Sequence, residues 1–391
     1  MKYLKVSILF FILLCSMAFK IEINNPNLRP FRVYVHSFKD KEGERIYSHI
    51  LNNLKQMPNF ELIGDKEGSD YEVAMSVEGE SFNIVLTNSK TGEFFNFRLK
   101  PFTTDIINNA NLLSDKIYEK ITQTKGVFST KIVFSMNWNG VRQVFLTDFS
   151  GKSFKRITDN RTDSIAPKLS HNRRYIVYTQ YLSSSGTALR LIDLETLHDR
   201  LLFSSKDINL AGGFDKDDNK IFFVSFDGKV SKVFELILSD LNKKELYSSR
   251  SRIVSPVTDF SDDNIAFVSD EYGSPQIFLF NKKERKAKKV SQTPSYATSP
   301  SFTIHGSHYA YIGQVNGKGN IYIASLDGSD FLPLTHNGNS YEDPVWLKNE
   351  RFILTHTYKD KASQIILIDI PTQQQIKLYN VPAKISYLSV N

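Results

Sequence analysis

Residues 299–312, SPSFTIHGSHYAYI, and residues 343–356, DPVWLKNERFILTH, carry the same pattern. In both, a proline is followed two positions later by an aromatic residue and nine positions later by an apolar run that is typical of a β-strand. The register returns through most of the chain, with anchors 44 or 45 residues apart at Pro167, Gly212, Pro256, Pro300 and Pro344. An internal repeat of this length predicts a modular fold.

Each repeat contains the signals of four strands. The apolar runs open at Ile176, Ile221, Ile265, Tyr309 and Ile353, and each is followed by another strand pattern, a turn and a short closing strand. A four-stranded unit every ~40–45 residues is typical of a β-propeller blade. An ordinary β-sandwich with similar strand spacing is the alternative, but five anchors in near-constant register favour the propeller.

The first and last units are incomplete in complementary ways. Lys131–Phe134 and Val144–Asp148 match the second and third strands of a blade, with no anchored strand before them. At the other end, Pro382 opens a single strand, 382–390. Joined, the two pieces make one blade, which closes a ring and removes two exposed sheet edges. We therefore expect residues 127–391 to form a six-bladed propeller closed by strand 382–390.

Residues 19–126 have a different pattern, in which strand and helix signals are mixed. Thr104 or Asp105 can cap the second helix, which should run to about residue 124. The order β-α-β-β-β-β-α predicts a small α/β domain with two helices packed on one sheet. The predicted fold is thus a two-domain one, a small N-terminal α/β domain followed by a six-bladed all-β propeller. The expected strands are 31–38, 60–63, 71–77, 82–87 and 94–99, and the helices 43–57 and 104–124.

Residues 1–18 have the three-part layout of a secretion signal. Lys2 and Lys5 precede an apolar run from Val6 to Cys15, and small residues then allow cleavage after Ala18. Two alternatives stay open, an uncleaved N-terminal helix and lipid attachment at Cys15, although the large Leu14 ahead of the cysteine disfavours the second. Cys15 is the only cysteine, so the mature chain would lack disulfides and thiolates. The formal net charge is +7, but export makes nucleic acid an unexpected partner.

The repeats resemble the WD40-like units of the TolB family, whose pattern is roughly P-x-W-S-P-D-G-x-x-I/L-A-F. The proline is kept in four units, but Gly306 is the one motif glycine still in register and Trp346 the one tryptophan. The stretch 118–132, YEKITQTKGVFSTKI, is similar to the helix end and linker that join the two domains in this family. Asp148-Phe149-Ser150-Gly151 matches the family's Asp-x-Asp-Gly turn. The resemblance covers essentially the whole mature chain.

This resemblance implies a periplasmic, protein-binding scaffold of a Tol–Pal-type envelope system. A Pal-like peptidoglycan-associated lipoprotein would bind the propeller, and a TolA-like protein anchored in the inner membrane would contact the mature N-terminus. The system supports outer-membrane integrity and constriction at cell division. It also implies a monomer without a direct membrane span.

The expected contact residues are of two kinds. Residues just before each innermost strand gather at one mouth of a propeller's channel, and the family places Pal contact there. The N-terminal segment alternates apolar and polar residues and could add as a strand to a partner's sheet; a frayed terminus is the alternative. The mouth residues are Ser164, Ile165, Asn209, Ala211, Val254, Ser255, Thr298, Ser299, Glu342 and Asp343, and the N-terminal ones are Phe19, Lys20, Ile21, Glu22 and Ile23.

The sequence offers poor signals for catalysis. It has no G-x-S-x-G, H-E-x-x-H or G-x-x-x-x-G-K-[ST] motif. His305 and His308 lie in a predicted turn without an evident third ligand, and the acidic stretches Asp215–Asp218 and Ser261–Asn264 fit structural turns. We therefore expect no enzyme activity, catalytic residue, metal or cofactor. The alternative is a periplasmic propeller that binds a small ligand or acts as a hydrolase or lyase in its central channel.

Overall fold

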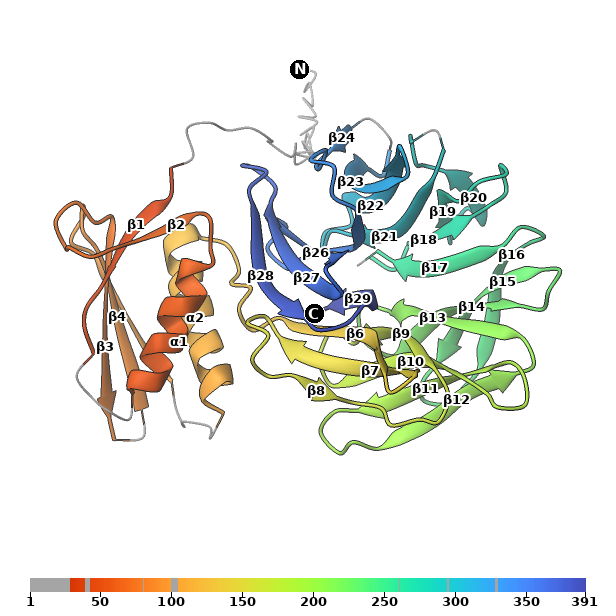
Figure 1. Ribbon diagram of the computed structural model, residues 1–391, viewed down its shortest axis with the longest axis horizontal. Coiled ribbons are helices and arrows are strands. Elements are labelled where there is room, and N and C mark those ends of the chain that lie inside the picture. Colours follow the sequence, from red (N-terminus) through yellow and green to blue (C-terminus); the bar gives the residue numbers. More distant parts are fainter. Residues whose placement is uncertain are drawn as a thin grey trace, which may run out of the picture.

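A computed structural model describes residues 29–38, 43–79, 81–99, 105–259, 261–293, 295–327 and 330–391. It contains an α/β region and a six-bladed β-propeller, which confirms the predicted fold class (Figure 1). The predicted signal with its cleavage site at Ala18, Cys15, and the N-terminal segment Phe19–Ile23 lie outside the described residues.

The α/β region has the predicted element order. Its sheet has the strand order β2-β1-β3-β4-β5, in which β1 runs parallel to β2 and β3 and the remaining pairs are antiparallel. Asp105 caps the second helix, because its Oδ1 accepts a hydrogen bond from the Asn108 amide at 2.9 Å. The elements are β1 (Phe31–Val35), α1 (Glu44–Lys55), β2 (Phe60–Ile63), β3 (Tyr71–Glu78), β4 (Ser81–Asn88), β5 (Phe94–Leu99) and α2 (Ile106–Thr122).

Each propeller blade is a four-stranded antiparallel sheet, named here from the innermost strand outward. Blade 1 is β29 (Ile385–Val390), β6 (Lys131–Trp138), β7 (Val141–Asp148) and β8 (Lys155–Arg156). Blade 2 is β9 (Ser164–Leu169), β10 (Tyr175–Tyr181), β11 (Thr187–Asp193) and β12 (Asp199–Ser205). Blade 3 is β13 (Ile208–Phe214), β14 (Lys220–Phe226), β15 (Ser231–Ile237) and β16 (Lys243–Ser249).

The other three blades repeat this order. Blade 4 is β17 (Ile253–Thr258), β18 (Asn264–Ser269), β19 (Gln276–Asn281) and β20 (Lys286–Lys289). Blade 5 is β21 (Ala297–Phe302), β22 (His308–Val315), β23 (Lys318–Ser325) and β24 (Phe331–Pro333). Blade 6 is β25 (Tyr341–Trp346), β26 (Phe352–Lys359), β27 (Ala362–Asp369) and β28 (Gln375–Val381).

The ring closes in blade 1, where β29 pairs with β6 from Ile385 opposite Met136 to Val390 opposite Ile132. The C-terminal strand is therefore the innermost strand of the first blade, as the split repeat predicts. It begins at Ile385 instead of residue 382, because Pro382 has no amide hydrogen and the Ala383 amide bonds back to the Val381 carbonyl.

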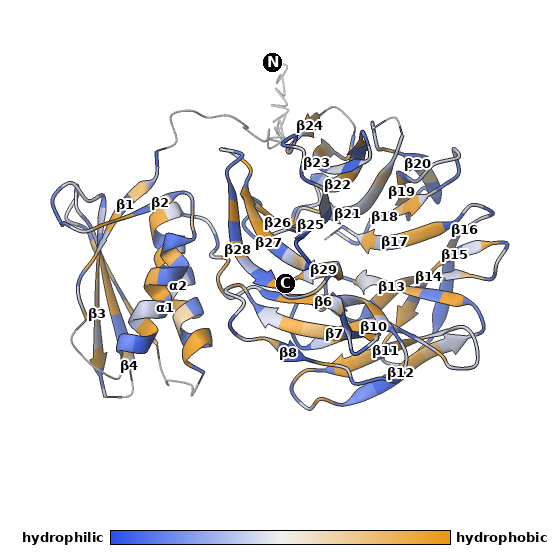
Figure 2. Ribbon diagram, viewed as in Figure 1, coloured by the Kyte–Doolittle hydropathy of each residue, from blue (hydrophilic) through white to orange (hydrophobic). Residues whose placement is uncertain are grey.

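Six apolar clusters hold the ring together, one between each pair of neighbouring blades. The strands are mostly apolar and their connections mostly hydrophilic (Figure 2). Five clusters each join two neighbouring blades from blade 1 to blade 6. The sixth joins blades 6 and 1 and continues into the core of the α/β region. The α/β region therefore packs on the junction where the ring is closed.

Aromatic side chains make this continuous core. Tyr118 of α2 is fully buried, and its ring lies 5.3 Å from that of Phe60 in the α/β sheet. It also lies 6.0 Å from Phe128 in the connection to blade 1 and 6.5 Å from Phe352 of blade 6. The α1 and α2 helices thus lie between the α/β sheet and the propeller (Figure 1). The predicted domain boundary between residues 126 and 127 falls in this connection and stays a prediction.

A buried carboxylate fixes the connection. Asp115 of α2 accepts hydrogen bonds from the backbone amides of Phe128 and Ser129 at 2.7 and 3.1 Å. Burial raises the pKa of Asp115 to about 6, and these hydrogen bonds only partly offset the cost of its charge.

The turns after the innermost strands explain why the repeat motif looks eroded. Gly306 has φ of +68°, and the equivalent residues Arg173, Asp218, Asp262 and Glu350 keep the same left-handed backbone at φ of 64, 57, 62 and 54°. The glycine is thus replaced without a change of turn, at a local cost in strain.

Two of these replacements have gained a contact between blades. The Asp218 carboxylate accepts hydrogen bonds from the amides of His171 and Asn172 in the preceding blade, both at 2.8 Å. Glu350 accepts one from the His305 amide at 2.8 Å in the same way. His305 is therefore an exposed turn residue with a structural contact, whereas His308, which the sequence also places in a turn, is buried at the start of β22.

Candidate protein-binding mouth

The propeller channel has two mouths, which we distinguish by the direction of the innermost strands. The first mouth is where these strands begin, near Ser164, Ile208, Ile253, Ala297, Tyr341 and Ile385. The second mouth is where they end, near Leu169, Phe214, Thr258, Phe302, Trp346 and Val390. All predicted mouth residues belong to the first mouth. They lie within the innermost strands instead of just before them.

A β-bulge in the innermost strands shapes the channel wall. The residue before each anchoring proline has positive φ, with Ala166 at 50°, Ser255 at 52°, Ser299 at 53° and Asp343 at 48°. The ladder to the second strand shifts register at the same place in each of these blades. A left-handed residue at a bulge turns its side chain away from the regular alternation. The bulge therefore decides what these side chains can reach.

Asp343 is the hub of this wall, because it joins three consecutive blades. Its Oδ1 accepts a hydrogen bond from Ser299 Oγ of blade 5 at 3.0 Å. Its Oδ2 accepts from the backbone amides of Tyr387 and Leu388 of blade 1 at 2.6 and 3.3 Å. His356 of its own blade places Nε2 3.5 Å from the same oxygen. Asp343 therefore holds the closing strand at the first mouth.

These contacts keep Asp343 ionised. Burial by itself would raise its pKa, but the hydrogen bond and charge of His356, the Ser299 hydroxyl and the Lys168 charge outweigh it. The pKa of Asp343 falls to about 2 as a result. The carboxylate sits between the serine and the histidine, so His356 does not activate Ser299 as in a Ser-His-Asp triad.

Four of the predicted mouth residues are buried in the wall, namely Ser164, Ile165, Asn209 and Ala211. The Ser164 carbonyl accepts from Ser135 Oγ at 3.1 Å, and the Asn209 carbonyl from Thr179 Oγ1 at 3.0 Å. Both contacts join neighbouring blades. These residues are therefore buried below the surface of the first mouth, where Ser164 and Asn209 hold neighbouring blades together.

The other predicted mouth residues are exposed to solvent to different degrees. Val254 is exposed, and Ser255, Thr298 and Ser299 are half-buried. The Glu342 side chain is 38% exposed and lies 3.5 Å from the Lys384 ammonium. The buried positions thus belong to blades 2 and 3, and the more exposed ones to blades 4, 5 and 6.

The first mouth also has an apolar rim that was not predicted from the sequence. It is formed where each second strand ends, since those ends pair with the beginnings of the innermost strands. Aromatic rings that are exposed on a rigid scaffold are typical anchors of protein interfaces. Most of these positions lie 14 to 16 residues after an anchor, so the repeat register itself could have found them. The exposed rim residues are Trp138, Tyr181, Tyr272, Val315 and Tyr358, and the sixth position is the half-buried Phe226.

Cations accompany three of the rim aromatics. The Arg156 guanidinium lies 5.6 Å from the Trp138 ring, Lys289 Nζ 5.9 Å from Tyr272 and Lys384 Nζ 5.7 Å from Tyr358. The rim thus offers apolar surface with positive charge beside it, a composition that suits a partner carrying acidic groups.

Two findings concern only the residues that the structure describes. No three of their His, Cys, Asp and Glu side chains gather into a group that could hold a metal ion. None of the helices in this part of the chain has the length and apolar character needed to cross a membrane.

Comparison with known proteins gives a consistent match. A family model described as the TolB beta propeller domain matches residues 118–387. The Tol-Pal system protein TolB of Rickettsia prowazekii (strain Madrid E) is 31% identical over 114 residues, 28% of this chain and 26% of that protein. The Tol-Pal system protein TolB of Rickettsia akari (strain Hartford) is 24% identical over 255 residues, 55% of this chain and 57% of that protein. The matched parts thus span between a quarter and just over half of these relatives.

Solved structures extend the match to both parts of the fold. TolB from Acinetobacter baumannii superposes with a TM-score of 0.82 at 16% identity, covering 93% of this chain and 96% of that chain. A putative TolB from Agrobacterium tumefaciens gives a TM-score of 0.52 at 10% identity, covering 66% of this chain and 90% of that chain. At these identities the likeness shows the fold.

Proposed function

The chain belongs to the TolB β-propeller family, and from this premise we propose that it is a periplasmic, protein-binding scaffold of a Tol–Pal-type system. In this proposal the signal at residues 1–18 directs export and is cleaved after Ala18. The chain then acts without catalysis, as a monomer, by holding two partners. The names of the Rickettsia relatives support the system.

The observation that carries the binding role is the rim of the first mouth. A partner that sits on this face would meet five exposed apolar side chains spread over five blades, with cations beside three of them. The scaffold under the rim is rigid, because Asp343 and the buried Ser164 and Asn209 tie neighbouring blades together. A preorganised surface of this kind loses little conformational entropy on binding.

We propose that a Pal-like peptidoglycan-associated lipoprotein is the partner at the first mouth. Of the residues predicted from sequence, Val254, Ser255, Thr298, Ser299 and Glu342 would be direct contacts, while Asp343 would act by shaping the mouth. The N-terminal segment Phe19–Ile23 would contact a TolA-like protein. Through the two contacts the chain would link the outer-membrane side to the inner membrane and support envelope integrity and constriction at division.

Calorimetric titration of the mature chain, residues 19–391, with the soluble domain of a Pal-like protein from the same cell tests the proposal. We expect saturable binding near micromolar, about −8 kcal/mol. Tyr272→Ala and Tyr358→Ala should each weaken it at least tenfold, since both rings are exposed and are truncated without opening the core.

Phe94→Ala is the matched control, because Phe94 is an equally exposed aromatic on β5 of the α/β sheet. The Phe94→Ala variant should bind the Pal-like domain with the affinity of the unmodified chain. Absence of heat at high concentration would refute the Pal assignment. Equal affinity of all three variants would leave a Pal-binding protein whose site is not the first mouth.

A further inference from the structure

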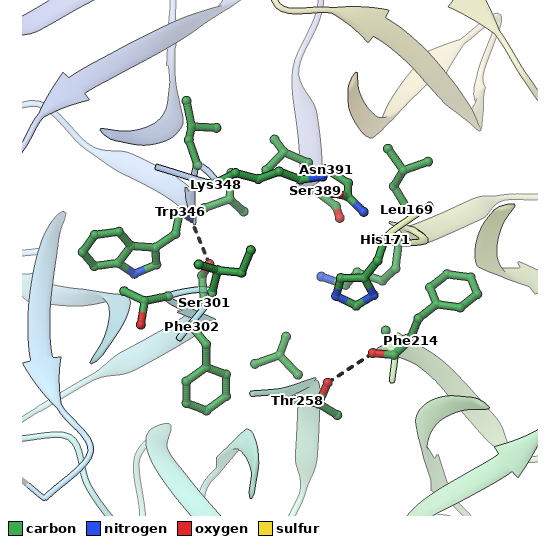
Figure 3. Close-up of a pocket in the computed structure, with 18 of the residues that line it drawn as sticks. Leu169, His171, Phe214, Thr258, Ser301, Phe302, Trp346, Lys348, Ser389 and Asn391 are labelled. Carbon is green, nitrogen blue, oxygen red and sulfur yellow. Dashed lines mark hydrogen bonds between the residues drawn. The ribbon is translucent and has the colours of Figure 1, made fainter. Parts of the chain in front are cut away.

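The second mouth of the channel contains a cavity of about 210 Å³. Trp346 and Phe302 lie on one side of the opening and Leu169 and Phe214 on the other, with their side chains directed outward from it (Figure 3). These side chains come from the ends of innermost strands in four different blades. The cavity is therefore a property of the closed ring and lies at the opposite end of the channel from the proposed protein-binding rim.

Two lysines that have no contact ion pair with a described residue line the cavity. Lys168 is on β9, and Lys348 is in the turn between β25 and β26. No carboxylate oxygen of the described chain lies within 4 Å of either ammonium group. By contrast, Lys282 on the outside of the propeller has Asp262 at 2.9 Å and Glu235 at 3.7 Å. The cavity lysines thus lack the close ion pairs that Lys282 has, although Asp343 attracts Lys168, and Asp218 and Asp115 attract Lys348, from beyond contact distance.

Two further cations increase the positive field at this mouth. Arg173 and Lys125 act on Lys348, and among the described residues neither has an ion pair. Burial lowers the pKa of Lys348 first, and repulsion from Arg173 and Lys125 lowers it further, to about 8. Burial also lowers the pKa of Lys168. Four cations therefore lie near this mouth, and Asp343, Asp218 and Asp115 compensate them only from beyond contact distance.

The nearby carboxylates already accept hydrogen bonds from other donors. Asp218 accepts from the His171 and Asn172 amides, and Asp115 from the Phe128 and Ser129 amides. Asp343 is held by blades 5 and 1, as described above. Moving any of them to a lysine would break buried hydrogen bonds, which costs more than an ion pair at such a site returns.

We propose that the second mouth is a binding site for a small organic anion, with an apolar body against Trp346 and Phe302 and a carboxylate or phosphate group toward Lys168 and Lys348. The volume fits a ligand of about one aromatic ring with its acidic group. The anion would supply the contact ion pair that Lys168 and Lys348 lack. This inference rests on the cavity and its charges and is independent of the proposed protein partner.

Isothermal titration of the full mature chain with phenyl phosphate and, separately, phenylacetate tests the site in low-salt Tris chloride at pH 7. We expect saturable one-to-one binding of at least one anion, and at least fivefold weaker binding in 0.5 M NaCl, because the attraction is electrostatic. Benzyl alcohol, which keeps the ring without the charge, should give no measurable heat. The stronger of the two anions identifies the acidic group that the site prefers.

Lys168→Met and Lys348→Met should each lower the affinity of the chain for the preferred anion at least fivefold. Lys348→Met should keep the unfolding temperature of the unliganded chain, whereas Lys168→Met should lower it slightly, because Asp343 loses a favourable charge. Lys232→Met is the matched control, because Lys232 is on β15 and is already paired with Glu245 at 2.9 Å. It should bind as the unmodified chain does.

Three results would each overturn the inference. They are the absence of binding of both anions at millimolar concentration, unchanged affinity in both cavity variants, and equal loss in Lys232→Met. A rise in unfolding temperature with the anion that is lost in Lys168→Met and Lys348→Met, but kept in Lys232→Met, would support it by an independent readout.

Discussion

Replacing Asp343 with asparagine removes the charge that joins the innermost strands of blades 5, 6 and 1. The side chain keeps its size, but Oδ2 accepts from the Tyr387 amide at 2.6 Å and Oδ1 from Ser299 Oγ at 3.0 Å. An amide group can accept through only one of its two ends, so at least one of these contacts is lost. The perturbation is therefore confined to hydrogen bonding and charge at the ring closure.

The pKa of this carboxyl gives the size of the effect. It falls from an ordinary 3.8 to about 2 in the folded chain. Each tenfold change in proton affinity is worth about 1.4 kcal/mol, so the ionised group stabilises the fold by about 2 kcal/mol at pH 7. Because the folded pKa is the lower one, this contribution is complete above about pH 4 and disappears as the pH falls through 2.

Urea unfolding followed by tryptophan fluorescence at pH 7 and pH 3 measures the prediction. Both tryptophans, Trp138 and Trp346, are in propeller blades 1 and 6, so the signal reports on the ring closure. Asp343→Asn should lose about 2 kcal/mol at pH 7 and about half of that at pH 3. Glu342→Gln, at the neighbouring exposed carboxylate, should cost less than about 0.5 kcal/mol at both.

Two outcomes would refute this reasoning. An equal loss at both pH values would mean that the side chain acts through its shape and not its charge. No loss at pH 7 would mean that the three-blade contact does not stabilise the ring.

Three further predictions concern the contacts that join neighbouring blades and that join the α/β region to the propeller. Asp115 has its pKa raised by burial to about 6, so its ionisation destabilises the fold as the pH rises from about 4 to 6. The stability of Asp115→Asn relative to the unmodified chain should therefore increase by about 2 kcal/mol between pH 4 and 7; a flat difference would contradict this. Asp218→Gly keeps the left-handed turn but loses the hydrogen bonds to the preceding blade. In chemical unfolding it should lower the free energy of unfolding by about 1–2 kcal/mol more than Asp217→Gly does. An equal loss in both variants would mean that this contact does not stabilise the fold. Tyr118→Ala should cost about 3–5 kcal/mol and lower the midpoint seen by the propeller tryptophans, whereas an unmoved midpoint would mean that the shared core does not couple the two parts.

The number of blades and the manner of closure could be predicted from sequence, because a blade is a local unit. Its strands pair with their neighbours along the chain, so the apolar runs and turns after Pro167, Pro256, Pro300 and Pro344 suffice to place them. Blade 1 was recoverable because its missing strand is the extra one at 382–390. The α/β elements and the Asp105 cap follow from equally local signals.

The roles of individual mouth residues were not predictable in this way. Glu342 and Asp343 are adjacent acidic residues, yet one is exposed and the other joins three blades. The bulge at Asp343, with φ of 48°, turns its side chain inward, and no periodic pattern marks that rotation. The loss of motif glycines was equally ambiguous, because only the structure shows that Asp218 and Glu350 keep the turn and gain a contact with the preceding blade.

The sequence by itself determined the repeat, the six blades and the mixed region that precedes them, since these depend on contacts between neighbours in the chain. The tertiary structure decided what the ring encloses. Lys125, Lys168, Arg173 and Lys348 come from separate parts of the chain, and each alone would be an ordinary solvated cation. Ring closure brings Lys168, Arg173 and Lys348 to one mouth and partly buries them, close to the exposed Lys125. The energetic effect of each charge depends on that burial and on the charges around it.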